Sequence, residues 1–240
     1  MPPLLSVNRL CKYFAGLAAV KDVSFQVEEG QICGLIGPNG AGKTTLLSII
    51  AGSAAPTSGR VSFRGKDITE WKPYEAVRAG VVRTHQVARP FRGMTARENV
   101  EVALHFGRGR ASAGDIVSEI LEQVGLTCVA DLAAGTLCVG DQKRLELART
   151  LATRPRLLLC DEVCGGLTES EMNEVLELLR HIRKRGTTIL YVEHNIRAIM
   201  SVCDQVVVLN FGQKLSEGPP HQIQKDAAVV EAYLGKTSVD

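Results

Sequence analysis

The chain has 240 residues with a formal net charge of +2 at pH 7, and 45% of its residues are hydrophobic, so we expect one globular unit with a substantial core. The nearly neutral charge argues against a nucleic-acid partner, and seven singly scattered cysteines argue against a zinc site or a disulfide framework. No run reaches the ~18 to 20 uncharged apolar residues of a membrane span, which predicts a cytosolic chain.

The first part of the chain predicts strands, a glycine-rich loop and a helix. Apolar patterns predict strands at residues 5–10, 23–27 and 31–37 and, after the helix, at residues 61–63. Between the last two, the segment KTTLLSIIAG has helical length and ends at Gly52, a residue suited to a helix C-terminus. The order is therefore strand, loop, helix.

The middle of the chain is predicted to be helical, and in the last third strands are predicted to alternate with helices. Thr95 and Glu98 form a capping box that opens a helix to about His105, and a second helix is expected over residues 115–124. After Arg156 come the strand LLLCD, a helix opened by the capping box TESE, the strand TTILYVE, a short helix and the strand QVVVLN. Strands that alternate with helices predict a parallel α/β sheet, so we expect the helical middle to be an inserted lobe.

The segment GPNGAGKTT, residues 37–45, matches the phosphate-loop pattern GxxxxGK[ST] between a predicted strand and a predicted helix. Gly40 and Gly42 permit backbone conformations in which successive N–H groups face phosphate oxygens. Lys43 can reach the β- and γ-phosphates, and the Thr44 hydroxyl can bind Mg²⁺. The ATP-binding residues predicted in this loop are Gly37, Pro38, Asn39, Gly40, Ala41, Gly42, Lys43, Thr44 and Thr45.

Two acidic residues end the apolar segment LLLCDE. Asp161 is placed to contact Mg²⁺ through water, and Glu162 to act as a general base beside the attacking water. A kinase would not need the second carboxylate, so the pair favours an ATPase. The alternative is an acidic strand end that only caps the following turn.

Two further candidates lie at the ends of predicted strands, where the carboxyl edge of a parallel sheet gathers ligand-binding groups. His194 lies in YVEHN, and Gln86 ends VVRTHQ at the junction with the helical lobe. Either residue alone would be interpreted as an ordinary surface side chain. Beside a phosphate loop, both become candidates for the nucleotide site.

The segment LCVGDQKRLELAR, residues 137–149, resembles the signature of ABC-type ATPases, which is commonly LSGGQ followed by a basic helix. Its predicted helix starts without a hydroxyl cap. In that family two chains pack head to tail, and the signature helix of one points its unsatisfied N–H groups at the γ-phosphate held by the other. The residues that would make this contact in trans are Cys138, Val139, Gly140 and Asp141.

The whole chain resembles an ATP-binding subunit of an ABC transporter, and more closely the branch that energises import of branched-chain amino acids and similar small polar solutes. The segments nearest to that branch are YFAGLAAVKDVSF, AGVVRTHQVARPFRGMTARENV and VVEAYLG. The resemblance implies a single α/β nucleotide-binding domain over residues 1–240. It would combine a mixed, mainly parallel sheet core with an N-terminal antiparallel β subdomain, an inserted helical subdomain at about 89–150 and a C-terminal extension at about 212–240.

The resemblance also implies roles for single residues and the cofactors ATP and Mg²⁺. Phe14 would stack on the adenine ring, and Val20 would lie beneath the nucleotide. Gln86 would contact Mg²⁺ and water and link to the membrane subunits, while His194 would hold the γ-phosphate and Glu162 in register. The implied catalytic residues are Glu162, His194, Lys43 and Gln86, and the implied metal site is Thr44, Gln86 and Asp161.

The signature departs from the pattern of the family. Cys138 stands where serine is usual, and Asp141 where glutamine is usual. Because a thiol is a poor hydrogen-bond donor, we expect the composite site that uses this signature to be the weaker of the two in a dimer. A heterodimer would tolerate such an asymmetry.

The implied partners are a second ABC ATPase subunit, identical or homologous, transmembrane permease subunits and a solute-binding protein. The chain would then lie on the cytoplasmic face of the cell membrane, held by the permease. Two alternatives stay open at this point: the ATPase of a lipid or lipopolysaccharide exporter, and a nucleotide-binding subunit with impaired turnover.

Overall fold

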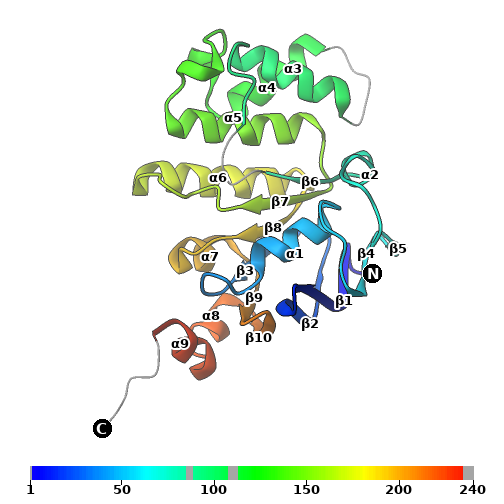
Figure 1. Cartoon of the computed structure of the whole chain (residues 1–240). Helices are drawn as coiled ribbons and strands as arrows, with labels where there is room; N and C mark the ends of the chain where they lie inside the picture. The colour runs from blue at the N-terminus through cyan, green and yellow to red at the C-terminus, as the bar shows by residue number, and fades with distance from the viewer. Residues whose placement is uncertain (1, 85–88, 108–112, 235–240) are drawn as a thin grey trace.

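The computed structural model describes residues 2–84, 89–107 and 113–234, and a six-stranded sheet lies at the centre of this part of the chain (Figure 1). The strand order is β10-β9-β3-β8-β7-β6, and only β10 runs antiparallel to its neighbour. The strands are β3 Ile32–Ile36, β6 Val81–Arg83, β7 Leu157–Asp161, β8 Thr188–Val192, β9 Gln205–Asn210 and β10 Gln213–Gly218. β3, β7 and β8 are buried along their whole length, which explains their continuous apolar sequences.

The parallel register brings the ends of three central strands to one edge of this sheet. Val192 of β8 pairs with Asp161 on one side and with Leu35 on the other. The chain therefore leaves β3, β7 and β8 at neighbouring points, and the segments that follow are the phosphate loop, the acid pair and the segment with His194. The predicted parallel α/β sheet is confirmed, and its carboxyl edge gathers candidates that are far apart in sequence.

A second sheet is antiparallel and has the order β2-β1-β4-β5. Its strands are β1 Leu5–Phe14, β2 Leu17–Val27, β4 Ser58–Phe63 and β5 Lys66–Asp67. Apolar side chains of this sheet, of helix α1 (Lys43–Ile50) and of one face of the central sheet form one buried cluster. The opposite face of the central sheet belongs to a second cluster that it shares with the helices that follow β6 in the chain.

The first two strands extend further than the apolar pattern predicts, since β1 continues past Leu10 and β2 begins before Val23. They form a hairpin whose turn contains Gly16 at a φ of 87°. Arg9 and Asp22 have positive φ angles, and the pairing of the two strands is irregular near them. These irregularities interrupt the alternation of side chains, so the sequence pattern marks only the regular part of each strand.

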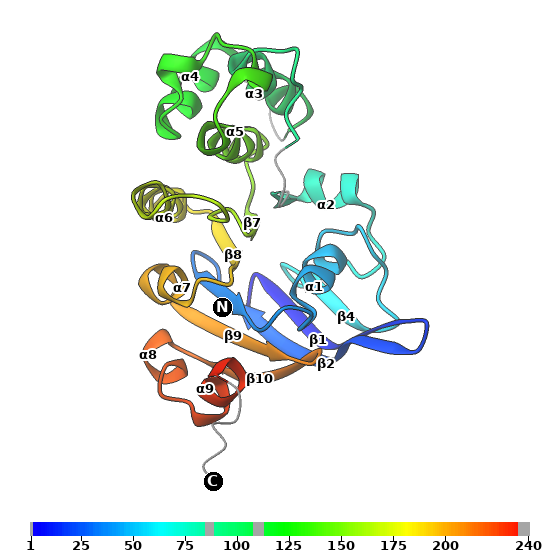
Figure 2. The ribbon, with the colours of Figure 1, turned by 60° about the vertical axis from the view of Figure 1, so that its left-hand side comes forward.

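Three helices, α3 (Ala96–Phe106), α4 (Ala113–Gln123) and α5 (Val139–Ala152), pack together at the end of the molecule opposite the C-terminal helices (Figures 1 and 2). The predicted capping box at the start of α3 is present. Thr95 Oγ1 accepts from the N–H of Glu98 at 3.1 Å, and the Glu98 carboxylate accepts from the N–H of Thr95 at 2.7 Å. Short 3₁₀ turns at Thr127–Val129 and Ala134–Thr136 connect α4 to α5.

The remaining helices flank the central sheet or follow it. The second predicted capping box opens the long helix α6, where Thr168 Oγ1 accepts from the N–H of Glu171. Three helices that the apolar pattern does not indicate have about two turns or fewer, too few for a clear periodicity. These are α2, α8 and α9. The bounds are α2 Pro73–Ala79, α6 Glu169–Lys184, α7 Ile196–Val202, α8 Pro220–Ile223 and α9 Ala227–Leu234.

Candidate active site

The loop between β3 and α1 is packed closely on the neighbouring backbone. A Cβ atom at Gly42 would lie 2.3 Å from the carbonyl oxygen of Ala19, and one at Gly37 would lie 2.3 Å from that of Leu209. Gly42 is the N-cap of α1 at a φ of 98°, and no side chain caps the helix or places an acid in its first turn. The start of α1 is thus an uncapped, electropositive helix end suited to an anion.

Lys43, the first residue of α1, is 6% exposed and folds back over this loop. Its Nζ donates to the carbonyl oxygens of Gly37 at 2.6 Å and Pro38 at 3.0 Å. Burial lowers the pKa of this ammonium group, while the charges of Glu162 and Asp161 act to raise it. The loop, the lysine and the acid pair therefore belong to one electrostatic unit.

The acid pair lies at the end of β7. Asp161 is 1% exposed, and its Oδ2 accepts from Arg83 Nη2 at 2.6 Å. Its other oxygen, Oδ1, is buried and has no hydrogen-bond partner among the described residues. Glu162 has a φ of 49°, an uncommon conformation for a side-chain-bearing residue, and its N–H donates to the carbonyl of Val192. Such strain is often found at functional sites.

His194 follows β8, and its side chain is 60% exposed. The residue before it, Glu193, is almost fully buried, although no motif in the sequence indicates this. The Glu193 carboxylate accepts from the N–H of Cys164 at 2.9 Å and from that of His194 at 3.2 Å. Burial raises the pKa of Glu193 above its ordinary value of 4.5, although the backbone hydrogen bonds oppose the shift. Glu193 therefore connects the histidine segment to the loop after the acid pair.

The predicted signature forms the start of α5 and lies at the surface, with Val139 61% exposed. The expectation of an uncapped start is wrong in one respect. Cys138 is the N-cap, and its Sγ accepts from the N–H of Asp141 at 3.4 Å. Sulfur is a weak acceptor, so the cap is present but weak. A Cβ at Gly140 would lie 2.8 Å from Glu171 Oε1, so this glycine lies close to the start of α6.

Within one chain, the signature is separated from the phosphate loop. In Figure 1, α6 and β7 lie between α5 and α1, and α5 and α1 lie apart in Figure 2 as well. The atoms nearest to a Cβ at Gly140 come from Glu171 and Cys138. The segment therefore presents its helix start to the outside of the chain.

Three other predicted residues have different environments. Phe14 ends β1 and is 51% exposed, with the Lys12 ammonium 5.0 Å from its ring centroid. Val20 is fully buried in β2, beside the position that a Cβ of Gly42 would take. Gln86 lies outside the described residues.

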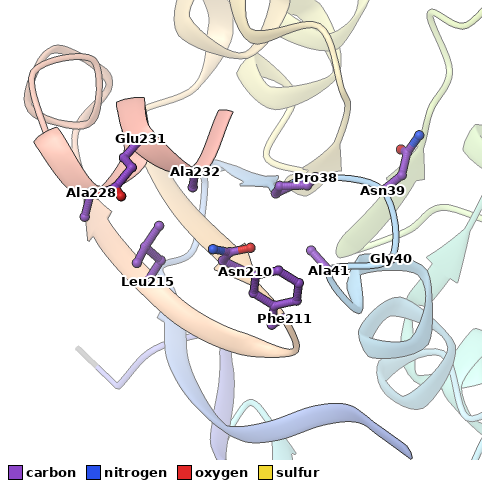
Figure 3. A pocket seen from close by; sticks show the side chains of 10 residues that line it. All are labelled: Pro38, Asn39, Gly40, Ala41, Asn210, Phe211, Leu215, Ala228, Glu231 and Ala232. Carbon is purple, nitrogen blue, oxygen red and sulfur yellow. The ribbon is translucent and has the colours of Figure 1, made fainter. Parts of the chain in front are cut away.

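The phosphate loop also borders a cavity of about 700 Å³ (Figure 3). Residues 38–41 of the loop line one side, and Asn210 and Phe211, at the turn from β9 to β10, lie across from them. Leu215 of β10 and Ala228, Glu231 and Ala232 of α9 complete the lining. The C-terminal elements thus adjoin the phosphate loop.

A lysine held at an uncapped helix start after β3, near two acids at the end of the parallel strand β7, defines a P-loop nucleotide-hydrolysing domain. Residues 20–165, more than half of the chain, match the ABC transporter family, and residues 213–238 match a family described as branched-chain amino acid ATP-binding cassette transporter. The chain belongs to the ABC transporter family, as an ATP-binding ATPase domain.

Relatives in bacteria align with nearly the whole chain. It is 40% identical to the high-affinity branched-chain amino acid transport ATP-binding protein BraF of Pseudomonas aeruginosa and 39% identical to LivG of Escherichia coli, with 98% of each chain covered in both cases. It is 34% identical to the lipopolysaccharide export system ATP-binding protein LptB of Acidithiobacillus ferridurans, again with 98% of each chain covered.

Solved structures confirm the fold. An ATP-binding cassette of an ABC transporter in its ADP conformation has a TM-score of 0.88 at 30% identity, over 98% of this chain and all of the other. A dimeric cassette in a post-hydrolysis state, bound to ADP and Pi, has a TM-score of 0.80 at 26% identity, over 90% of this chain and 98% of the other. Among the described residues, every helix is too short or too polar to cross a membrane.

Proposed function

We propose that this ATPase energises import of branched-chain amino acids or similar small polar solutes, through ATP-driven, head-to-tail association with a second ATPase subunit. The observation that carries the nucleotide part is the uncapped start of α1, with Lys43 buried between the loop carbonyls and the acid pair. The transported solute is inferred from the names of the relatives, which describe branched-chain amino acid transport.

Triphosphate binding follows from charge and shape. The N–H groups at the start of α1 provide donors and a positive end of the helix dipole, and Lys43 provides a full charge. In this proposal Lys43 exchanges its bonds to Gly37 and Pro38 for bonds to phosphate oxygens. Phe14, exposed at the end of β1, would offer its ring to the adenine.

The residues present fit a Mg²⁺ ion. Thr44 is exposed in the first turn of α1, and Asp161 offers a buried carboxylate oxygen without a partner in the described structure. Mg²⁺ prefers hard oxygen ligands and often takes only one or two of them from the protein, the rest from phosphates and water. When bound, the ion would neutralise charge on the phosphates. Gln86 stays a proposed third ligand.

We assign the general base to Glu162. Its backbone is fixed by the bond to the carbonyl of Val192 in a left-handed conformation, which directs it differently from its strand neighbour Asp161. It would accept a proton from the attacking water, and His194, exposed after the neighbouring strand β8, would orient the γ-phosphate.

The chain needs a partner for the signature to act. Cys138 and Val139 are exposed, and α6 and β7 separate them from their own phosphate loop (Figure 1). A second chain placed head to tail would bring this helix start to the γ-phosphate of its neighbour. The dimeric relative bound to ADP and Pi supports association of cassettes around nucleotide.

The test of the nucleotide chemistry is Glu162→Gln. We expect this variant to bind ATP as the wild type does but to lose nearly all steady-state hydrolysis, because the amide cannot accept the proton. Turnover at the wild-type rate would remove Glu162 from the mechanism. If the wild type itself does not bind ATP, the whole proposal is overturned.

The membrane partners are proposed from the same relatives. Permease subunits would hold the chain at the cytoplasmic face, docking on the surface between Gln86 and the helical lobe, and a solute-binding protein would deliver the solute. On that surface the ring of Phe91 is half exposed, with the Arg149 guanidinium 5.1 Å away.

A lipopolysaccharide or lipid exporter is the second candidate because of the similarity to LptB. The two are separated by reconstituting the chain with its permease subunits in vesicles. Stimulation of ATP hydrolysis by leucine, isoleucine or valine with a binding protein supports import, and stimulation by lipopolysaccharide alone supports export.

A further inference from the structure

Arg83, the last residue of β6, joins two parts of the proposed metal site that no motif connects. Its Nη2 donates to Asp161 Oδ2 at 2.6 Å, and its Nη1 donates to Ser48 Oγ at 2.8 Å. The Arg83 side chain is 17% exposed and that of Asp161 only 1%. A mostly buried guanidinium thus holds a buried carboxylate at one oxygen.

Ser48 extends this connection to the start of α1. Its hydroxyl donates to the carbonyl oxygen of Thr44, one turn earlier, at 2.7 Å. Hydrogen bonds therefore run from Thr44 through Ser48 and Arg83 to Asp161. The two ends are the two described residues that we propose as metal ligands.

The second oxygen of Asp161, Oδ1, is the one left available for the metal. Oδ1 is buried and has no partner in the described part of the chain, although buried carboxylate oxygens normally have one. With Oδ2 held by Arg83, rotation of the carboxylate is restricted, and Oδ1 alone is left to accept a bond from a metal-bound water.

We propose that Arg83 is a positioning residue for Mg²⁺: it holds Asp161 by Oδ2 and fixes it relative to α1, so that Oδ1 serves the metal. The inference rests on the proposed nucleotide site. A fork of two donors is required because one guanidinium must reach Asp161 and Ser48 at once. Lysine has the same charge but cannot provide this fixed geometry.

The experiment measures the affinity for fluorescent trinitrophenyl-ATP, once with excess Mg²⁺ and once with EDTA. In Arg83→Gln we expect the gain that Mg²⁺ gives to nucleotide affinity to fall by about tenfold, as for other residues that orient a metal ligand. Binding in EDTA should stay unchanged, since the phosphate loop and Lys43 are intact. Arg83→Lys should show a similar loss, because the fork is absent.

Arg78→Gln, on the exposed side of α2, is the matched control and should behave as the wild type. An unchanged or larger Mg²⁺ gain in Arg83→Gln would overturn the proposal, because the arginine would then be only a competing cation. An equal loss with Mg²⁺ and with EDTA would also overturn it, as would full recovery in Arg83→Lys.

Ser48→Ala provides a second test should Arg83→Gln not fold. It removes only one of the two Arg83 partners, so a smaller loss of the Mg²⁺ gain is expected, and no loss would contradict the positioning role. Failure of the wild type to bind the nucleotide under either condition, with Mg²⁺ or with EDTA, would overturn the proposed function, a result distinct from a change in the Mg²⁺ gain alone.

Discussion

Glu193 illustrates how a single buried group can tie two catalytic segments together. Its carboxylate lies in the apolar interior yet accepts the N–H groups of Cys164 and His194, which belong to different loops. The Tyr191 hydroxyl and the Cys164 thiol, 3.2 Å apart, are buried beside it. We interpret Glu193 as the anchor that keeps His194 close to the acid pair.

The raised pKa of Glu193 predicts a pH dependence of stability. Well below pH 4.5 the Glu193 carboxyl is protonated in both the folded and the unfolded chain, so it gives no pH dependence there. As the pH rises above that value, the unfolded chain ionises first, whereas the folded chain must keep the proton or bury the charge. The free energy of unfolding should therefore fall from pH 4.5 up to the raised pKa of the folded state.

We expect Glu193→Gln to lack this part of the slope in urea unfolding measured across that pH range. Glu101→Gln, an exposed acid on α3, serves as the control and should keep it. Identical slopes in the wild type and in Glu193→Gln would contradict the assignment.

At the scale of elements, the start of α5 carries a weak cap where the helix end is proposed to meet phosphate. Cys138 Sγ is 3.4 Å from the N–H of Asp141, and a serine hydroxyl would be the stronger acceptor and the stronger donor. In the Glu162→Gln background, Cys138→Ser should raise ATP-driven dimerisation by about 1.5 kcal/mol per site, because the hydroxyl can donate to the γ-phosphate and a hydrogen bond to a charged group contributes about that much.

Sedimentation equilibrium with ATP and Mg²⁺ measures this effect. Cys128→Ser replaces another exposed thiol, outside the signature, and should leave the dimerisation constant unchanged. Equal constants for Cys138→Ser and Cys128→Ser would mean that the thiol cap does not weaken the composite site.

Elements with strong local signals could be predicted from the sequence. The buried strands β3, β7 and β8 have continuous apolar sequences, and the helices α3 and α6 begin with capping boxes. Both signals depend only on residues that are close together in the sequence. The full length of β1 and β2 could not be predicted, because bulges interrupt their alternation. Short helices such as α9 depend on packing against β10 and have little local signal.

The candidate site divides in the same way. Residues of the phosphate loop, Asp161 and Glu162 follow from motifs, because the spacing of glycine, lysine and acids reflects the chemistry. Arg83 and Glu193 could not be found from motifs, because their roles depend on partners that are distant in sequence. Arg83 contacts Asp161, 78 residues away, and Glu193 contacts Cys164, 29 residues away. The only local signal was a charged residue at the end of an apolar strand.

At the scale of the whole molecule, the account depends on two chains completing each other. The phosphate loop and the signature lie at α1 and α5, which α6 and β7 separate (Figure 1). Asn39, Gly40 and Thr44 of the phosphate loop are exposed, and so are Cys138 and Val139 of the signature. The central claim is that ATP bound by one chain is enclosed by the helix start of another.

Mixing two inactive variants tests this claim most directly. Lys43→Met removes the phosphate-loop cation, and Gly140→Asp places a carboxylate at the signature, where the nearby Glu171 side chain can move aside. In a head-to-tail dimer of one of each, the Gly140→Asp chain supplies an intact phosphate loop and the Lys43→Met chain an intact signature, so one complete site is restored. We predict that each variant alone has no ATP hydrolysis and that the mixture recovers a fraction of the wild-type rate. An inactive mixture, beside an active wild type and two folded variants, would contradict the account.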